Sequence, residues 1–151
     1  MLAALSLSDC ELSVVLCDDV VMRELNRTHR NIDRPTDVLA FAMTEGQRMP
    51  SGQLLLLGDV VISVATAARQ AKTSGKDLSA EATFLLAHGL LHLIGFDHAT
   101  AAQERRMSAH TEKLVAAAVS RGATAADGLR TIVPSRLRST RRPTPRRPTS
   151  R

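Results

Sequence analysis

Three of the five histidines lie within residues 88–98, which read HGLLHLIGFDH. His88 and His92 are four residues apart, so on a helix their imidazoles share one face about 5–6 Å apart. Gly95 can adopt the left-handed conformation that ends a helix, and His98 can then turn back toward the other two rings. Three protein ligands with a fourth position open to water are typical of a catalytic zinc site. The pattern therefore predicts that His88, His92 and His98 bind one metal ion, with zinc preferred.

The same spacing occurs in the metzincin peptidases, whose motif is H-E-x-x-H-x-x-G-x-x-H. Gly89 stands where those enzymes have the glutamate that acts as general base. A metal at this site can still lower the pKa of its water toward about 7 and polarise a carbonyl or phosphoryl oxygen. Asp97 is expected mainly to orient an imidazole or to have a structural role, with proton transfer as the other option. A zinc peptidase or another metal hydrolase stays an alternative, which the missing glutamate disfavours.

The elements that position these residues follow from the hydrophobic pattern. Strands are expected at residues 11–16, 38–43 and 54–63, with a bulge or bend at Gly58 and Asp59. Helices are expected at residues 19–27 (capped by Asp19), 64–73 (ended by Gly75), 79–95 (capped by Ser79) and 101–119. Strands and helices do not alternate regularly, which predicts an α+β fold. In it a small mixed sheet packs against helices, and a buried central helix carries two of the three histidines.

Three segments, in order, resemble the YbeY family of bacterial zinc-dependent endoribonucleases, which mature ribosomal RNA. They are LNRTHRNIDRPTDVLAF (residues 25–41), LGDVVIS (residues 57–63) and HGLLHLIGFDH (residues 88–98). The resemblance covers roughly residues 11–119. It implies a single-strand-specific enzyme that processes the 3′ end of 16S rRNA and takes part in ribosome quality control. Its implied partners are ribosomal RNA and the small ribosomal subunit.

The resemblance assigns roles to individual residues. His88, His92 and His98 match the zinc ligands of the family, one ion per chain, and Arg30 matches the arginine implicated in RNA cleavage. A guanidinium can hold a phosphate through two hydrogen bonds and stabilise the charge that develops during cleavage. Three further residues fall on family motif positions and are expected to support the site as loop, cap and strand-end residues: Thr36, Asp37 and Asp59.

The chain departs from the family pattern at both ends and at one position within a motif. Family members usually have a strand and most of a helix before the segment that matches residues 11–16. The chain is therefore interpreted as an endoribonuclease domain at residues 1–122, apparently lacking these elements, followed by a basic tail at residues 123–151. Phe96 stands where the family usually has tyrosine.

The positive charge is concentrated in the tail. Residues 128–151 contain eight arginines and no acidic residue, whereas residues 1–127 contain 12 Lys and Arg against 15 Asp and Glu. The Pro- and Ser-rich tail is expected to be disordered and to be able to contact RNA phosphates without sequence preference. No apolar run approaches the ~20 residues that span a bilayer. The chain is expected to be cytoplasmic, with no membrane partner.

Three functions from different classes remain open. The favoured one is a metal-dependent endoribonuclease in which Arg30 holds the scissile phosphate. The second is a metzincin-like zinc peptidase or another metal hydrolase. The third is a non-catalytic ribosome-assembly factor whose zinc only fixes the central helix to the loop that follows it.

Overall fold

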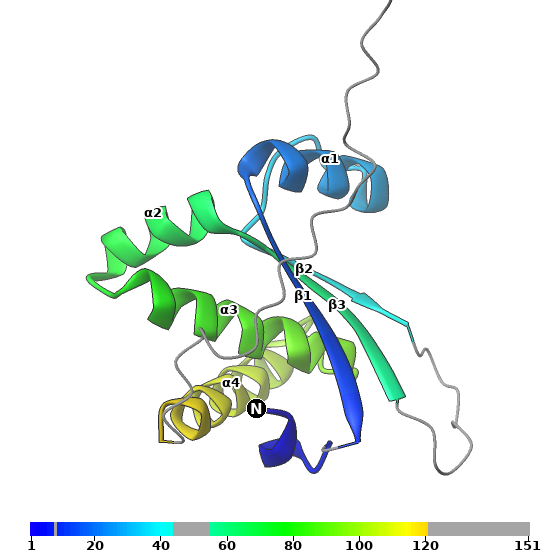
Figure 1. The fold of residues 1–151 in the computed structure, drawn as a ribbon, viewed down its shortest axis with the longest axis vertical. Helices are drawn as coiled ribbons and strands as arrows, with labels where there is room; N and C mark the ends of the chain where they lie inside the picture. Colours follow the sequence, from blue (N-terminus) through cyan, green and yellow to red (C-terminus); the bar gives the residue numbers. More distant parts are fainter. Residues whose placement is uncertain (8, 44–54, 121–151) are drawn as a thin grey trace, which may run out of the picture.

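The computed structural model describes residues 1–7, 9–43 and 55–120 (Figure 1). In chain order the elements are η1 (Leu2–Leu5), β1 (Cys10–Cys17), α1 (Asp19–Arg30), β2 (Val38–Ala42), β3 (Leu55–Ser63), α2 (Val64–Ser74), α3 (Leu78–Leu93) and α4 (Ala101–Ser120). The sheet has the order β1-β3-β2, with β1 parallel and β2 antiparallel to the central β3. The predicted α+β fold with a small mixed sheet is confirmed. The tail at residues 123–151 lies outside the described residues.

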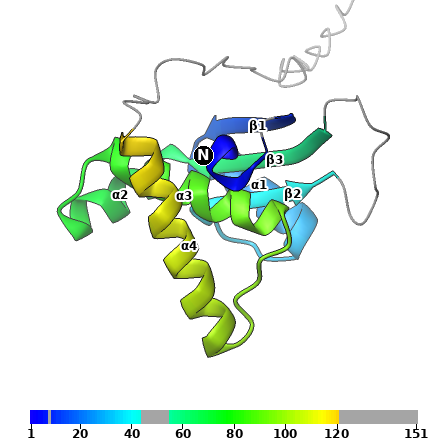
Figure 2. The same ribbon diagram turned by 90° about the horizontal axis from the view of Figure 1, so that it is seen from below.

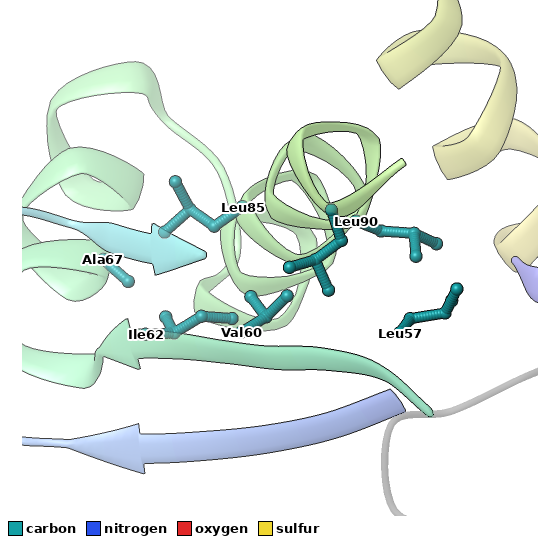
Figure 3. Packing of buried hydrophobic residues seen from close by; sticks show 7 residues of the cluster. Leu57, Val60, Ile62, Ala67, Leu85 and Leu90 are labelled. Atoms are coloured by element: carbon teal, nitrogen blue, oxygen red, sulfur yellow. The ribbon is translucent and has the colours of Figure 1, made fainter. Parts of the chain in front are cut away.

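Successive side chains of β3 point to opposite faces of the sheet, and each face is covered by a helix. Val60 and Ile62 point to the cluster that includes Leu85 and Leu90 of α3 (Figure 3). Val61, between them, packs instead in a cluster with Met22 of α1. The sheet therefore separates α1 from α3. Figure 2 shows α3 and α4 together on the side of the sheet opposite α1.

Helix α3 is the buried central helix that the sequence predicts. Seven of its residues are buried, and Leu90 and Leu91 are completely inaccessible. Its N-cap is Asp77, so the predicted cap at Ser79 is wrong: Ser79 lies inside the first turn, where its backbone carbonyl accepts a hydrogen bond from the Thr83 hydroxyl. Asp77 is followed directly by the apolar Leu78, and the helix therefore begins one residue earlier than the pattern suggests.

Two other boundary predictions are tested by the backbone geometry. The bulge in the third strand is confirmed, because the register between β1 and β3 shifts there and Gly58 has a φ of 137°. The cap of α1 is Asp18, whose carboxylate accepts a hydrogen bond from the Val21 amide, and Asp19 is the first helical residue. Helix α1 also continues to Arg30, beyond the predicted end at residue 27, and Asn31 ends it in the left-handed conformation.

Asp19 connects α1 to the junction between β3 and α2. Its carboxylate accepts hydrogen bonds from the hydroxyls of Ser63 and Thr66 and from the Arg69 guanidinium. These bonds, the one from Ser63 most strongly, lower the pKa of Asp19 to about 2. One carboxylate thus holds the start of α1 against the start of α2.

Replacement of Asp19 by asparagine should destabilise the protein at neutral pH, and the deficit should disappear in acid. The pKa is lower in the folded state, so the stabilisation is complete above the ordinary aspartate pKa near 4 and is lost as the pH falls to about 2. Urea unfolding of the wild type and Asp19→Asn from pH 7 to pH 2 measures this. The control is Asp77→Asn, because the Asp77 side chain makes no capping hydrogen bond. A difference between wild type and Asp19→Asn that stays constant with pH would contradict the assignment.

No helix among the described residues is long and apolar enough to cross a membrane.

Candidate metal centre

The three histidines of residues 88–98 converge. One nitrogen from each of His88, His92 and His98 lies within 4.8 Å of the other two. The ring centroids are 4.9 Å apart for His88 and His92, 5.1 Å for His92 and His98, and 5.9 Å for His88 and His98. Because zinc binds imidazole nitrogens at about 2.0–2.1 Å, a small rotation of the rings would bring all three nitrogens to one ion. The predicted cluster is confirmed, and it could hold a metal ion.

The loop after α3 brings His98 back to the helix. The Gly95 amide donates to the His92 carbonyl and the Phe96 amide to the Leu91 carbonyl, which closes the end of the helix. Gly95 has a φ of 90°, the left-handed turn that the sequence predicts. The Asp97 carboxylate accepts a hydrogen bond from the His98 amide at 2.7 Å, while it lies 4.0 Å from the His98 ring nitrogen Nδ1. Asp97 therefore fixes the backbone of the loop and makes no hydrogen bond to the imidazole.

The surroundings of the cluster favour neutral imidazoles. Burial lowers the pKa of His88, and the neighbouring His92 and His98 lower it further. Burial and His98 also lower the pKa of His92, against the opposing effect of the Phe96 backbone. Neutral imidazole is the form that binds a metal. His98 is exposed, so the cluster is open to solvent on one side. In the described ranges no other group of three or more His, Cys, Asp or Glu side chains has this geometry.

The cluster forms one wall of a cleft of about 900 Å³. The C-terminal end of α1 and the loop that follows also line this cleft, with Arg30 and Arg34. Residues of the edge strand β2 line the cleft as well. The positive charge of Arg30 contributes to the low pKa of His92, which indicates that the guanidinium lies near this imidazole. The structure therefore brings Arg30 and the three histidines, which are far apart in the sequence, into one cleft.

The loop that carries Arg34 is held by its neighbours. The buried Asn26 donates from its side-chain amide to the Arg34 carbonyl at 2.7 Å. Arg23 binds Asp33 through two hydrogen bonds of 2.7 Å each. By contrast, the guanidinium groups of Arg30 and Arg34 make no hydrogen bond or ion pair with any residue that the structure describes. The cleft thus presents two unpaired guanidinium groups, and hydrogen bonds from α1 hold the loop that carries Arg34.

Asp37 supports the cleft, as the sequence predicts for a loop residue. Its Oδ1 accepts hydrogen bonds from the Thr36 hydroxyl and the Val38 amide, and its Oδ2 accepts one from the Gln70 side chain at 2.9 Å. Asp59, in contrast, is paired inside β3 and does not line the cleft, so its expected place at a strand end is wrong. Gln70 and Asn26 were not singled out by the sequence analysis. Gln70 acts on a distant residue and belongs to no motif, and Asn26, although it lies in the segment at residues 25–41, acts on a backbone carbonyl eight residues away.

The chain is similar to proteins of a known family over most of its length. The family model described as "Endoribonuclease YbeY" matches residues 2–118. The chain belongs to the YbeY family. It is 49% identical over 113 residues to the endoribonuclease YbeY of Moorella thermoacetica, covering 72% of each chain. It is 44% identical over 120 residues to that of Aquifex aeolicus, covering 80% of this chain and 77% of the relative. The resemblance inferred from the three sequence segments is therefore confirmed, and with it an enzyme family that hydrolyses RNA phosphodiester bonds.

A solved structure agrees with the fold. The solution structure of a Thermotoga maritima protein superposes with a TM-score of 0.51 and 23% identity, covering 80% of this chain and 78% of that one. At this identity the likeness concerns the architecture alone.

Gly89 explains why this YbeY family chain lacks the metzincin glutamate. A Cβ atom added at Gly89 would lie 2.7 Å from Cγ1 of Val60 in β3 and 3.3 Å from Cγ2 of Val38 in β2. Helix α3 therefore packs tightly against the sheet at the position where a metzincin has its general base. A glutamate side chain has no room there, which argues against the peptidase alternative.

Replacement of Gly89 by alanine should destabilise the protein by about 1–3 kcal/mol, because Val60 is completely buried and has no space to move. The loss should appear even though alanine favours helix by up to about 1 kcal/mol. Urea unfolding measures the difference. Ala80→Gly, the reverse change at an exposed position of the same helix, gives the propensity effect alone. A Gly89→Ala variant more stable than the wild type would contradict the close packing.

Proposed function

We propose that this chain is a single-strand-specific, zinc-dependent endoribonuclease that acts in ribosomal RNA maturation. The observation that carries the proposal is the cleft lined by both an unpaired arginine and three convergent imidazoles. The YbeY name of its relatives supports RNA as the substrate. By the same kinship we propose processing of the 3′ end of 16S rRNA, ribosome quality control and the small ribosomal subunit as the cellular context, in the cytoplasm.

His88, His92 and His98 are the proposed zinc ligands. Three imidazoles are a donor set that zinc prefers, and His98 on the exposed side leaves a position open to solvent. A zinc ion bound there supplies Lewis acidity toward a phosphoryl oxygen and lowers the pKa of its water. Asp97 holds the backbone that presents His98, so it acts on the site through another residue.

Arg30 is the proposed phosphate-binding residue. It lies at the C-terminal end of α1, and its guanidinium is not neutralised by any carboxylate among the described residues. A guanidinium stays charged at every physiological pH and can bind two phosphate oxygens at once. Its contacts strengthen as negative charge develops on the phosphate during cleavage, which lowers the barrier. Because the loop after Arg30 is anchored by Asn26, little reorganisation is needed when RNA binds.

One assay separates this function from the two alternatives. Zinc-loaded protein is incubated with a labelled single-stranded RNA, the same RNA as a duplex, and a peptide library. Cleavage of the single strand alone supports the proposal. Peptide cleavage would establish the metal-peptidase alternative. No turnover of either polymer, with a large loss of thermal stability on chelation, would establish the assembly factor with structural zinc.

Removal of residues 123–151 should leave the rate of cleavage at saturating RNA unchanged, because the proposed chemistry lies between Arg30 and His98. The truncated chain lacks eight arginines, so its affinity for RNA should be lower and should depend less steeply on salt concentration. Single-turnover cleavage and binding from about 50 to 200 mM salt measure both quantities. Loss of the saturated rate in a truncated protein that still unfolds cooperatively would contradict the division into residues 1–122 and a tail.

A further inference from the structure

A second cavity lies beside the metal centre, between α3 and α4. Its volume is about 260 Å³, and it shares His88, His98 and Asp37 with the larger cleft. Helices α3 and α4 lie side by side in both views (Figures 1 and 2). The two cavities therefore meet at the histidines. A strand whose phosphate contacts Arg30 in the cleft has a neighbouring nucleotide within reach of the second cavity.

The walls of this cavity are apolar and its rim is polar. Phe84 and Leu85 of α3 and Met107 of α4 form the walls. Glu104 and Ser108, one turn apart on α4, are exposed residues on the same face as Met107. A cavity with apolar walls and a few polar side chains is suited to an aromatic heterocycle.

Glu104 is the free hydrogen-bond acceptor of this cavity. The other carboxylate, Asp37, already accepts from Thr36, Val38 and Gln70. The Glu104 carboxylate makes no hydrogen bond or ion pair within the described part of the chain. It is therefore available to a ligand. Beside a free carboxylate, a group that donates hydrogen bonds is favoured over a phosphate.

We propose that this cavity binds one nucleobase next to the scissile phosphate and that Glu104 selects guanine. The proposal rests on the endoribonuclease function above. Pockets for drug-sized ligands span about 300–1,000 Å³, so about 260 Å³ holds a single purine but no second nucleotide. Guanine is the only one of the four bases whose pairing edge presents two adjacent N–H donors. A carboxylate accepts both at once, as it does from an arginine fork. Adenine, cytosine and uracil present at most one such donor beside an acceptor that the carboxylate repels.

The test is base preference at the cut, measured with the full chain loaded with zinc. A single-stranded RNA pool with a randomised segment is cleaved, and both ends of the products are sequenced. We expect guanine to be enriched about tenfold or more at one of the two positions that flank the cut, the range of a good bidentate base contact. Glu104→Gln should reduce this enrichment to about twofold, because an amide offers a donor and an acceptor and so accommodates every base.

Glu112→Gln is the matched control. Glu112 is an exposed residue of the same helix that lines neither cavity, and the substitution changes the net charge by the same amount. It should leave the guanine enrichment intact. No base preference in the wild type, or a preference that Glu104→Gln leaves unchanged, overturns the proposal while the endoribonuclease function stands.

A binding measurement distinguishes failure of the nucleobase pocket from failure of the proposed endoribonuclease function. Fluorescence anisotropy, read within seconds of mixing, compares an oligouridine with the same strand that carries one central guanosine. Tighter binding of the guanosine strand by the wild type and by Glu112→Gln, lost in Glu104→Gln, supports the pocket even if no strand is cleaved. Absence of cleavage would then refute only the proposed function. Equal binding of both strands by all three proteins would refute the pocket.

Discussion

Arg30→Ala is expected to lower the rate of RNA cleavage by about a hundred- to a thousandfold, the cost of removing one group that stabilises transition-state charge. The fold should be unaffected, since Arg30 is exposed and makes no hydrogen bond or ion pair with the described residues. Arg30→Lys should recover part of the loss, because lysine retains the charge but not the planar pair of donors. Single-turnover kinetics separate the effect on the cleavage step from the effect on RNA affinity.

Arg27→Ala is the control for this prediction. Arg27 is exposed on the same helix, is paired with Glu24 and does not line the cleft. Its removal should change cleavage by less than about threefold, within the effect of an exposed ion pair. If Arg30→Ala cleaves RNA as fast as Arg27→Ala does, the arginine is not part of the chemistry. The histidine cluster would then have to act alone.

Loss of the metal is expected to cause the second large decrease in the rate of RNA cleavage. His88→Ala should lower cleavage by more than about a hundredfold, because changes that only touch the surroundings of a metal ligand already cost about 10–100-fold. A chelator should abolish cleavage by the wild type and lower its Tm by about 5–10 °C, the value for an ion present at a hundred times its Kd. Metal content by mass spectrometry should fall from one ion per chain to none in both cases.

Metal binding is expected to weaken as the pH falls. Protons compete with the metal for the imidazoles, and the pKa values of His88 and His92 lie below the ordinary 6.5. Metal affinity should therefore be constant at neutral pH and above, and should fall only as the pH drops below about 6.5. His110→Ala is the control, since His110 packs against Phe96 outside the cluster. Full metal content and activity in His88→Ala would exclude the site.

The sequence predicted the convergence of the three histidines well because its geometry is local. Two of the three ligands share one helix face by spacing alone, and Gly95 predicts the turn that returns the third. The position of Arg30 in the same cleft as the cluster had no such local signal. Its role came from the family resemblance, since an arginine in a polar loop looks the same whether it faces a cleft or the solvent.

What the sequence missed depends on contacts between distant elements. The hydrogen bond from Gln70 to Asp37 joins α2 to the loop before β2, and no periodicity encodes it. The reason for Gly89 became visible only with Val60 in place, because the close approach of helix and sheet is a property of packing. The caps at Asp18 and Asp77 were each misplaced by one or two residues, since several neighbouring polar residues compete for such positions.

The sheet that separates α1 from α3 has a consequence for catalysis. Helix α1, which ends at Arg30, packs near Val61 on one face of this layer, and α3, which carries His88 and His92, packs on the other face. Residues of both helices and of the edge strand β2 line the same cleft. The β-layer therefore acts as a spacer that sets the distance between the helix that carries Arg30 and the helix that carries two of the histidines. Any change that thickens this layer would slow the enzyme without touching a residue of the cleft.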